Sequence, residues 1–445
     1  MTDKDTIAAI STAHGKSAIG VIRVSGQNVQ AIINEFVGRK LKPRFATNVK
    51  IHDKNNFLID DVIVIYYEAP SSYTGEDMLE IQSHGNPITM DFILENICSS
   101  HARISRPGEF TERAFLNNKI DLVQAEAIAD LINASHISAS KAAMITLQGN
   151  FSKNIGLLID EVLMLRANIE ACINFPEDDS PKISSKNNSN AINLLISSLS
   201  KLITSVNNGI IVNKKPVITI IGKPNVGKSS LANFLLGEQG SIVSSIPGTT
   251  RDALHHEVVL SKNNITIIDT AGLRETSDSI EMQGIEITKK SISSASMILY
   301  VVDDSIGFDE EDERLIAENS IDTCWVINNK IDISGAEPNI TVQDGKTFFN
   351  VSTLNGLGMD NLKNKLSENS IPDDETTGTA RLRHLEHLSS SLDNLLIARD
   401  CNNNQQLELV AEELRLAHAN LVAIMGGDVN EDLLDRIFSD FCIGK

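Results

Sequence analysis

Hydrophobic and polar positions divide the chain into segments with different periods. From Asp5 to about Asn118, short apolar runs such as AIGVIRVSG and FLIDDVIVIYY are separated by Gly, Pro and Ser, with helical stretches near Asn28 and Pro87. Short strands bounded by turn residues are typical of a small α+β domain. We place this domain at residues 1–118.

The period then becomes that of helices, in two separate stretches. Apolar residues recur every three or four positions, which predicts amphipathic helices that pack in a bundle. The first stretch contains Leu122, Ala125, Ala129, Ile132, Ile155, Leu158, Val162, Ile169, Ile192, Ile196, Leu199, Leu202 and Val206, and the second contains Leu382, Leu385, Leu388, Leu392, Leu395, Leu407, Val410, Leu414, Ala417, Leu421 and Ile424. We place the two parts of this helical domain at 119–212 and 373–445.

Between the helical stretches, apolar strands alternate with helical segments. The strands include VITII, ITIIDT, MILYVVD and CWVIN, a pattern typical of a doubly wound parallel sheet. We place this α/β domain at 213–372 and interpret it as an insertion, since a domain with neighbouring termini can be inserted with little disturbance. The predicted fold class is multidomain, combining α/β, all-α and N-terminal α+β parts.

Composition limits the partners and the compartment. The 445 residues carry 39 basic and 59 acidic side chains, a net charge of -20, which excludes coating nucleic acid by charge alone. An RNA contact would need a local basic patch or a partner. The five cysteines form no CxxC pair and the chain has no apolar run of about 18 residues, so we expect a cytoplasmic protein without membrane insertion.

A glycine-rich motif follows the strand VITII. Gly222, Gly227, Lys228 and Ser229 form G-x-x-x-x-G-K-S, in which backbone N–H groups turn toward phosphates. Lys228 would contact the β- and γ-phosphates, and the Ser229 hydroxyl would bind magnesium. Taken alone, the motif leaves a chance loop match open.

Two further motifs suit a triphosphate. DTAG begins at Asp269, which could hold the hydrated metal or be an ordinary strand-end carboxylate. GTTRD contains Thr250, either a second magnesium hydroxyl or part of a surface turn. Their order after the phosphate loop favours the nucleotide interpretation.

NKID, from Asn329 to Asp332, selects the base. The Asp332 carboxylate can accept from the N1–H and 2-amino groups of guanine, and adenine lacks both donors. Asn329 can address the other purine edge and Lys330 can pack over the ring, although a polar turn that caps a strand would have the same composition. VST, which contains Ser352, would be the last base contact.

Together these motifs predict GTP binding by an inserted P-loop GTPase domain of the Ras-like type. The expected contacts are Asn225, Val226, Gly227, Lys228, Ser229, Ser230, Ser244, Ser245, Ile246, Pro247, Gly248, Thr249, Thr250, Asp269, Thr270, Ala271, Gly272, Asn329, Lys330, Asp332 and Ser352.

Hydrolysis needs a positioned water molecule and added positive charge. Small signalling GTPases use a Gln after DTAG, but this chain has Leu273 there. Glu281 is a candidate to orient the water, with Glu275 and Asp278 as competitors. Asn225 could offer an oxygen to a monovalent cation, or be an ordinary turn asparagine.

The order of these motifs, the interrupted helical region and the final FCIGK resemble the family of tRNA modification GTPases MnmE, also called TrmE. GVIRVSG, SSYTGEDMLEIQSHG and RPGEFTERAFLNNKIDLVQAEAIADLI extend the resemblance over the full length. It implies a homodimer that binds a 5-formyl or 5,10-methylene tetrahydrofolate through its N-terminal domain. With the flavoprotein MnmG, in a heterotetramer, such a GTPase adds an aminomethyl or carboxymethylaminomethyl group to C5 of the wobble uridine of certain tRNAs.

The resemblance also implies roles for particular residues. Potassium, in place of an arginine finger, would be held by Asn225, Ser244, Ile246 and Thr249, and Glu281 would orient the water. Folate would contact Arg23, Glu80, Lys119 and Lys445, with the Cys442 thiol beside the one-carbon unit. Without the resemblance, Arg23, Glu80 and Lys119 would be interpreted as surface or capping charges, and Cys442 as a buried, inert thiol.

Two other functions remain open. One is a ribosome-assembly GTPase, although such proteins usually append a basic RNA-binding module and this tail is acidic and helical. The other is a folate-binding scaffold in which the nucleotide only switches conformation. Equal low rates of GTP hydrolysis in potassium and in sodium would favour the scaffold.

Overall fold

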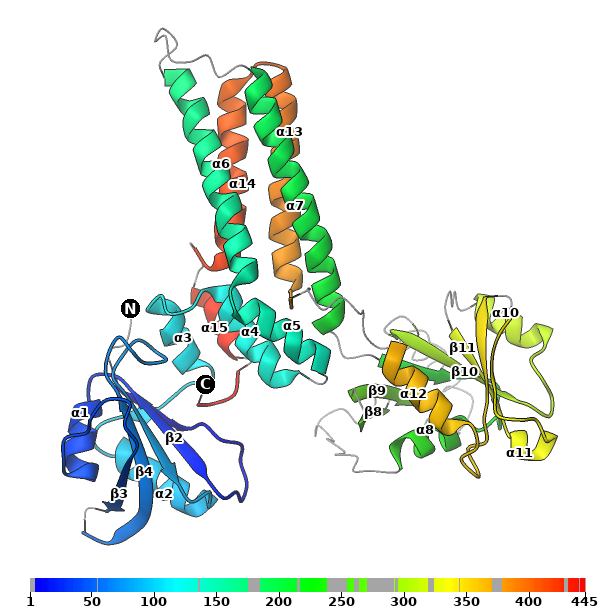
Figure 1. The fold of residues 1–445 in the computed structure, drawn as a ribbon, viewed down its shortest axis with the longest axis horizontal. Helices are drawn as coiled ribbons and strands as arrows, with labels where there is room; N and C mark the ends of the chain where they lie inside the picture. Colours follow the sequence, from blue (N-terminus) through cyan, green and yellow to red (C-terminus); the bar gives the residue numbers. More distant parts are fainter. Residues whose placement is uncertain are drawn as a thin grey trace, which may run out of the picture. The chain divides into compact units, whose positions relative to one another are not determined.

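The computed structural model describes residues 5–53, 55–134, 137–174, 185–213, 217–237, 254–259, 264–269, 292, 295–318, 324–343, 345–369, 378–427, 431–439 and 441–444. The chain forms two compact units (Figure 1). The first unit comprises residues 1–133, 143–207 and 378–445, and the second comprises 134–142 and 208–377. The predicted combination of α+β, helical and α/β parts is confirmed. The exact domain boundaries remain predictions.

The first unit contains a mixed sheet with the strand order β3-β4-β5-β2-β1-β6. Its strands are β1 (Ile7–Ile10), β2 (Gly20–Ser25), β3 (Thr47–His52), β4 (Leu58–Tyr67), β5 (Met78–Ser83) and β6 (Arg103–Ile104). Only β1 and β6 pair in parallel. Because side chains alternate between the two faces of a strand, Ile22, Val24, Leu79 and Ile81 face one side and form the core there.

Helices cover that apolar face. They are α1 (Val29–Ile32), a π-helical turn η1 (Ile33–Val37) and α2 (Pro87–Cys98). Helix α2 lies in the helical stretch predicted near Pro87. Pro87 occupies its first turn, and the Asn86 side chain accepts from the N–H of Ile88. On the opposite face, Phe110 of α3 (Glu109–Leu116) packs on β1 and β5. On that second face, the side chains of Arg23 of β2 and Glu80 of β5 are partly exposed, at 26% and 16%.

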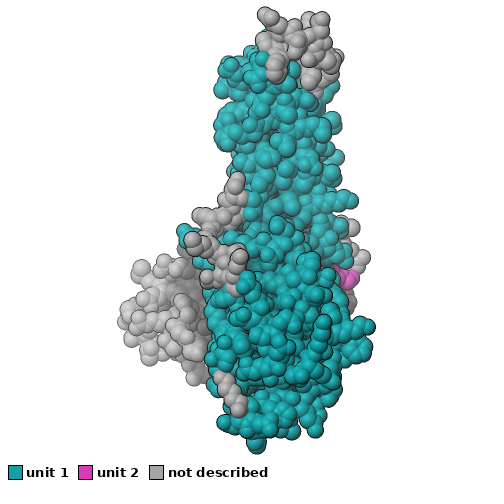
Figure 2. Space-filling view, turned by 90° about the vertical axis from the view of Figure 1, so that its left-hand side faces the viewer, with its two compact units in different colours: residues 1–133, 143–207, 378–445 teal, residues 134–142, 208–377 magenta. Residues whose placement is uncertain are grey.

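The helical part of the first unit pairs segments that are far apart in sequence. Its elements are α4 (Leu122–Asn133), α5 (Ile137–Leu147), α6 (Asn150–Asn174), α7 (Ser185–Asn213), α13 (Leu382–Asn403), α14 (Leu407–Met425) and α15 (Glu431–Ser439). Helices α6, α7, α13 and α14 pack side by side as a bundle. Figure 2 shows a continuous surface of the first unit, in teal, from this bundle to the N-terminal domain.

Helix α4 makes a buried polar contact with the start of α13. The Glu126 carboxylate accepts from His384 Nε2 at 2.7 Å and from Arg383 Nη2 at 3.1 Å, and Glu126 and His384 are almost fully buried. Burial alone would raise the pKa of Glu126, but the hydrogen bond from His384 and the nearby arginines lower it to about 2. Helix α4 also packs on α15 through Leu122 and Ala125. Helix α4 therefore joins the C-terminal helix to the point where the chain re-enters the helical domain.

The second unit is a doubly wound sheet with the order β12-β13-β11-β10-β7-β9-β8. Its strands are β7 (Val217–Ile221), β8 (Leu254–Val259), β9 (Asn264–Asp269), β10 (Met297–Asp303), β11 (Cys324–Asn329), β12 (Ile340–Gln343) and β13 (Lys346–Asn350), and its helices include α8 (Lys228–Leu236), α10 (Glu310–Glu318), α11 (Ile331–Ser334) and α12 (Met359–Asn369). Strands β9, β7, β10, β11 and β13 run parallel.

Helices pack on both faces of this sheet. Leu231 of α8 and Leu362 of α12 enter the core on one face, and Ile316 of α10 enters the core on the other. The carboxyl ends of the parallel strands meet at one edge, where ligands of such folds bind. Within the described ranges, no helix combines the length and the apolar character needed to cross a membrane.

Candidate nucleotide and one-carbon sites

The phosphate loop connects the end of β7 to the start of α8. Gly222 and Gly227 have φ of 144° and 100°, a region that glycine enters at little cost. A Cβ at Gly222 would lie 2.2 Å from the carbonyl oxygen of Val301, and one at Gly227 would lie 2.2 Å from Nδ2 of Asn329. Both glycines are therefore required for the loop to pass so close to β10 and β11. This geometry is compatible with the predicted phosphate contacts of the loop, which remain predictions.

Lys228 is the first residue of α8, and its ammonium group lies inside the loop. Its Nζ donates to the carbonyl oxygens of Gly222, at 2.9 Å, and Lys223, at 2.7 Å. These bonds hold the positive charge beside backbone N–H groups at the start of a helix. Such an arrangement favours an anion.

The NKID segment is attached to the phosphate loop. Asn329 is almost fully buried, donates from Nδ2 to the oxygen of Val226 at 3.0 Å, and accepts at Oδ1 from the N–H of Thr353 at 3.1 Å. Asp332 accepts a hydrogen bond from the Ser352 hydroxyl. The side-chain amide of Asn329 thus connects the phosphate loop to NKID and VST, the two segments expected to bind the base.

Lys330 reinforces this connection. Its Nζ donates to the carbonyl oxygen of Asn225 at 2.8 Å and to Oδ2 of Asp303 at 2.6 Å. Burial raises the pKa of Asp303, but hydrogen bonds from Lys330 and Ser305 outweigh that effect and lower the pKa below its usual value. Asn225 has φ of 61°, which places it in a tight turn.

An acidic group that sequence reasoning missed holds the loop from outside. Lys223 pairs with Asp309 at 2.8 Å and with Asp312 at 3.2 Å, and the hydroxyl of buried Tyr300 donates to Asp312 at 2.8 Å. The hydrogen bond from Lys223 lowers the pKa of Asp309 to about 2. In the sequence, this group is indicated only by the acidic run DEEDE after β10, and such a run is also typical of a solvated helix start.

Several predicted residues lie outside the described part of the chain. They are Ser244, Ser245, Ile246, Pro247, Gly248, Thr249, Thr250, Thr270, Ala271, Gly272, Leu273, Glu275, Asp278, Glu281, Lys445 and the side chain of Asp269. The magnesium, potassium and water-orienting assignments therefore remain predictions. Ser229 and Ser230, in the first turn of α8, are within it.

Arg23 and Glu80 form an ion pair on the open face of the N-terminal sheet. They are direct cross-strand partners on β2 and β5, and Arg23 Nε donates to Glu80 Oε1 at 2.9 Å. The Tyr67 hydroxyl donates to Glu80 Oε2 at 3.3 Å, and the Tyr73 ring lies 5.7 Å from the Arg23 guanidinium. These tyrosines were not singled out from the sequence, although Tyr73 belongs to the quoted SSYTGED string.

Lys119 lies beside the loop that carries Tyr73. Its Nζ donates to the carbonyl oxygen of Pro70 at 3.0 Å. Its stem packs against Gly75, where a Cβ would lie 3.3 Å from Lys119 Cγ. The structure thus brings three of the four residues expected to bind folate around the loop 68–77, which joins β4 to β5.

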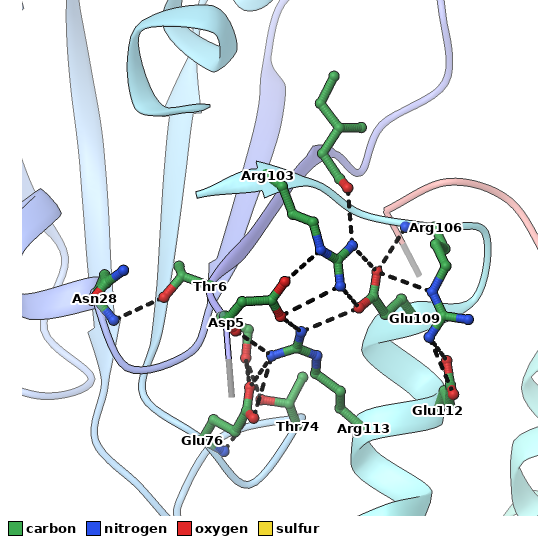
Figure 3. Close-up of polar contacts among 12 residues, drawn as sticks. Asp5, Thr6, Asn28, Thr74, Glu76, Arg103, Arg106, Glu109, Glu112 and Arg113 are labelled. Carbon is green, nitrogen blue, oxygen red and sulfur yellow. Dashed lines mark hydrogen bonds and ion pairs between the residues drawn. The ribbon is translucent and has the colours of Figure 1, made fainter. Parts of the chain in front are cut away.

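A network of ion pairs anchors this loop (Figure 3). Arg113 of α3 pairs with Glu76 of the loop at 3.1 Å, with Asp5 at 2.8 Å and with Glu109 at 3.1 Å. Arg103 pairs with Glu109 at 2.6 Å, and the Glu109 side chain is 3% exposed. Burial raises the pKa of Glu109, but hydrogen bonds from Arg103, the Arg106 N–H and Arg113 lower it to about 2.

Acid should therefore weaken this network. A carboxyl with a lowered pKa stabilises the fold above its unfolded pKa near 4.5, and the contribution, roughly 3 kcal/mol, is lost between pH 4.5 and about 2. Glu109→Gln should therefore reduce the loss of unfolding free energy between pH 6 and pH 3. Hydrogen exchange of residues 103–117 along a urea series would measure it.

Glu112, one turn later on α3, provides the matched control. Burial raises the pKa of Glu112, so its contribution has the opposite sign and grows as the pH falls. Glu112→Gln should therefore increase the loss of unfolding free energy between pH 6 and pH 3. If the Glu109→Gln variant and the wild type lose the same unfolding free energy between pH 6 and pH 3, Glu109 is not the group whose protonation weakens the network.

The C-terminal segment that follows α15 lies against the N-terminal domain. Pro107 and Ile443 form a β-bridge, and Ser11 Oγ donates to the carbonyl oxygen of Gly444 at 2.9 Å. Gly444 has φ of 90°, and a Cβ there would lie 2.4 Å from the oxygen of Ile10. The Cys442 side chain is exposed, contrary to its interpretation as a buried thiol. The role of the Cys442 thiol remains a prediction.

The β7–α8 loop, its contacts with NKID and the parallel sheet define a P-loop nucleotide-binding protein with an added N-terminal domain. Residues 122–442 match the family model described as MnmE helical domain, and residues 6–119 match GTP-binding protein TrmE N-terminus. The chain is 40% identical over 452 residues to the tRNA modification GTPase MnmE of Coxiella burnetii (strain Dugway 5J108-111), covering 99% of both chains. It is 40% identical over 453 residues to that of Nitrosospira multiformis, covering 100% of both. The chain belongs to the MnmE family of tRNA modification GTPases.

Proposed function

We propose that the protein hydrolyses GTP and, together with the flavoprotein MnmG, modifies C5 of the wobble uridine of certain tRNAs in the cytoplasm. The group added is an aminomethyl or carboxymethylaminomethyl group, built with the one-carbon unit of a 5-formyl or 5,10-methylene tetrahydrofolate. The observation that carries this proposal is 40% identity to named tRNA modification GTPases over essentially the full length. The same match argues against the ribosome-assembly alternative.

In the nucleotide site, the chain binds and orients the triphosphate. N–H groups of the loop 222–229 face the phosphates, Lys228 neutralises charge on the β- and γ-phosphates, and Asp332 pairs with guanine. Ser229 and Thr250 would hold magnesium. Potassium on Asn225, Ser244, Ile246 and Thr249 would supply the positive charge that an arginine finger supplies elsewhere, while Glu281 orients the water. The tight glycine cradle and the Lys228 ammonium support this assignment.

In the N-terminal domain, a reduced folate suits the charges of the open sheet face. The amino-pyrimidone edge of a pterin presents donors like those of guanine, so the half-buried Glu80 can accept from it while Arg23 fixes the carboxylate. Lys119 and Lys445 suit the carboxylates of the tail, with Cys442 beside the one-carbon unit. The chain would form a homodimer through this domain and a heterotetramer with MnmG. Because the chain itself has a net charge of -20, MnmG would supply much of the basic surface that tRNA requires.

Helix α4 offers a route from GTP hydrolysis to one-carbon chemistry. Leu122 and Ala125 of α4 pack on α15, which leads to Cys442, and Glu126 of α4 accepts a hydrogen bond from His384 at the start of α13. A change in the position of α13 would therefore bear directly on α4. We infer that the bundle conveys rearrangements of the inserted domain to the C-terminal segment through this helix.

Mass spectrometry of wobble nucleosides tests the proposal. Cells lacking this protein should lose the modified wobble uridine, and the wild-type chain should restore it. Cys442→Ser should fail to restore it, whereas Cys401→Ser, a change on α13, should succeed. An unchanged nucleoside profile in the deleted cells would reject the modification role, and full rescue by Cys442→Ser would reject the role of the thiol.

A further inference from the structure

Two cations converge on the loop that carries Tyr73. Lys119 Nζ donates to the carbonyl oxygen of Pro70 at 3.0 Å, and Arg44 Nη2 donates to that of the next residue, Ser71, at 2.7 Å. Both side chains belong to exposed residues. Among the residues that the structure describes, neither cation has a carboxylate within ion-pair distance.

The other arginines near this face are paired differently. Arg23 is bound to Glu80, and Arg103 and Arg113 each bind carboxylates of the network in Figure 3. A guanidinium has five N–H donors, and the single bond to Ser71 leaves most of those of Arg44 available. In a chain of net charge -20, two cations that bind consecutive carbonyls and have no acidic partner among the described residues indicate a place for an external anion.

Arg44 is also connected to the Arg23–Glu80 pair. Its guanidinium lies over the Tyr67 ring, 5.7 Å from the centroid, and the Tyr67 hydroxyl donates to Glu80. Arg44, Tyr67, Glu80 and Arg23 therefore form a continuous row across the open face. One end of the row suits the amino-pyrimidone ring of a pterin, and the other suits negative charge.

The surroundings hold these cations in place before any ligand binds. Arg44 has φ of 59°, and its N–H donates to the oxygen of Tyr66 at 2.7 Å. The loop is fixed by Asn117, which donates to the oxygen of Thr74 at 2.7 Å, and by the Glu76–Arg113 ion pair. Preorganised donors bind an anion with little loss of side-chain entropy.

We propose that Arg44 and Lys119 form a subsite for successive carboxylates of an oligoglutamyl folate tail. The inference rests on the proposed function, in which a reduced folate binds at Arg23 and Glu80. Each added γ-linked glutamate brings one more carboxylate on a flexible chain, so a longer tail reaches both cations. Arg44 is thus a specificity-determining residue for tail length.

Calorimetric titration of the full-length protein with 5-formyltetrahydrofolate monoglutamate and triglutamate tests the subsite. The wild type should bind the triglutamate about fivefold more tightly, and the preference should shrink in about 0.5 M KCl. Arg44→Met should reduce the ratio of the two affinities to about two and leave the monoglutamate affinity nearly unchanged. Arg44→Lys should retain most of the ratio.

Arg39→Met is the matched control, because Arg39 is an exposed arginine on the same connection and donates to the oxygen of Asn48. It should keep the wild-type ratio. An unchanged ratio in Arg44→Met, or equal weakening of both ligands, would overturn the subsite, since equal weakening means that Arg44 only supports the loop. A wild type that binds neither ligand would instead reject folate binding itself.

Discussion

Replacing Lys228 by alanine is expected to reduce the rate of GTP hydrolysis at saturating GTP by at least about a hundredfold. The rate depends on neutralising charge that develops on the phosphates, and removing one preorganised donor of this kind costs about 10²–10³ in rate. Lys228 Nζ is fixed inside the loop by the oxygens of Gly222 and Lys223. No other lysine among the described residues bonds to both of these carbonyls.

Lys223, five positions earlier on the same loop, provides the comparison. Its ammonium group is paired with Asp309 and Asp312, so Lys223→Ala should loosen the loop and weaken GTP binding less than about tenfold without a large change in the saturated rate. Phosphate release should be measured in potassium and in sodium. Wild-type hydrolysis should be faster in potassium, and Lys228→Ala should be slow in both salts. A Lys228→Ala rate within tenfold of the wild type would contradict the proposed role.

Features encoded over a short stretch of sequence were predictable. The strand, glycine turn and helix at residues 217–236 follow from local pattern, and so does the helix near Pro87. The phosphate and base motifs could be placed together because parallel strands end at one edge of a sheet. In each case the residues that act together are adjacent in sequence or follow successive strands.

Side-chain partnerships between distant elements were not predictable. Glu126 lies among alanines and leucines of α4, and only the fold shows that His384 and Arg383, more than 250 positions later, neutralise it. Arg44 and Tyr67 similarly appear as ordinary surface residues until the loop 68–77 brings them to the Arg23–Glu80 pair. A single sequence carries no signal for such contacts, since the residue types are common on any surface.

Replacing Asp332 by asparagine should change which base the protein accepts. A carboxylate that receives two hydrogen bonds from guanine contributes about 1.5–3 kcal/mol for each, so GTP affinity should fall at least about a hundredfold. Xanthine keeps the N1–H donor but carries an oxygen at C2. The asparagine oxygen can accept from N1–H while its amide donates to that oxygen. Hydrolysis of xanthosine triphosphate should therefore improve in the variant that loses GTP.

Asp304→Asn is the matched control for this substitution. Asp304 follows directly after β10 and accepts the hydroxyl of Ser334, as Asp332 accepts that of Ser352. Asp304 belongs to no base-recognition motif. Titration of each variant with GTP, ATP and xanthosine triphosphate separates loss of fold from change of specificity. If Asp332→Asn disrupted the fold, all three nucleotides would bind more weakly. Altered base pairing would instead weaken the binding of GTP and strengthen that of xanthosine triphosphate. If Asp332 accepts from the two donors on guanine, Asp332→Asn should bind GTP more weakly and xanthosine triphosphate more tightly. An Asp332→Asn variant that still prefers GTP would exclude that role.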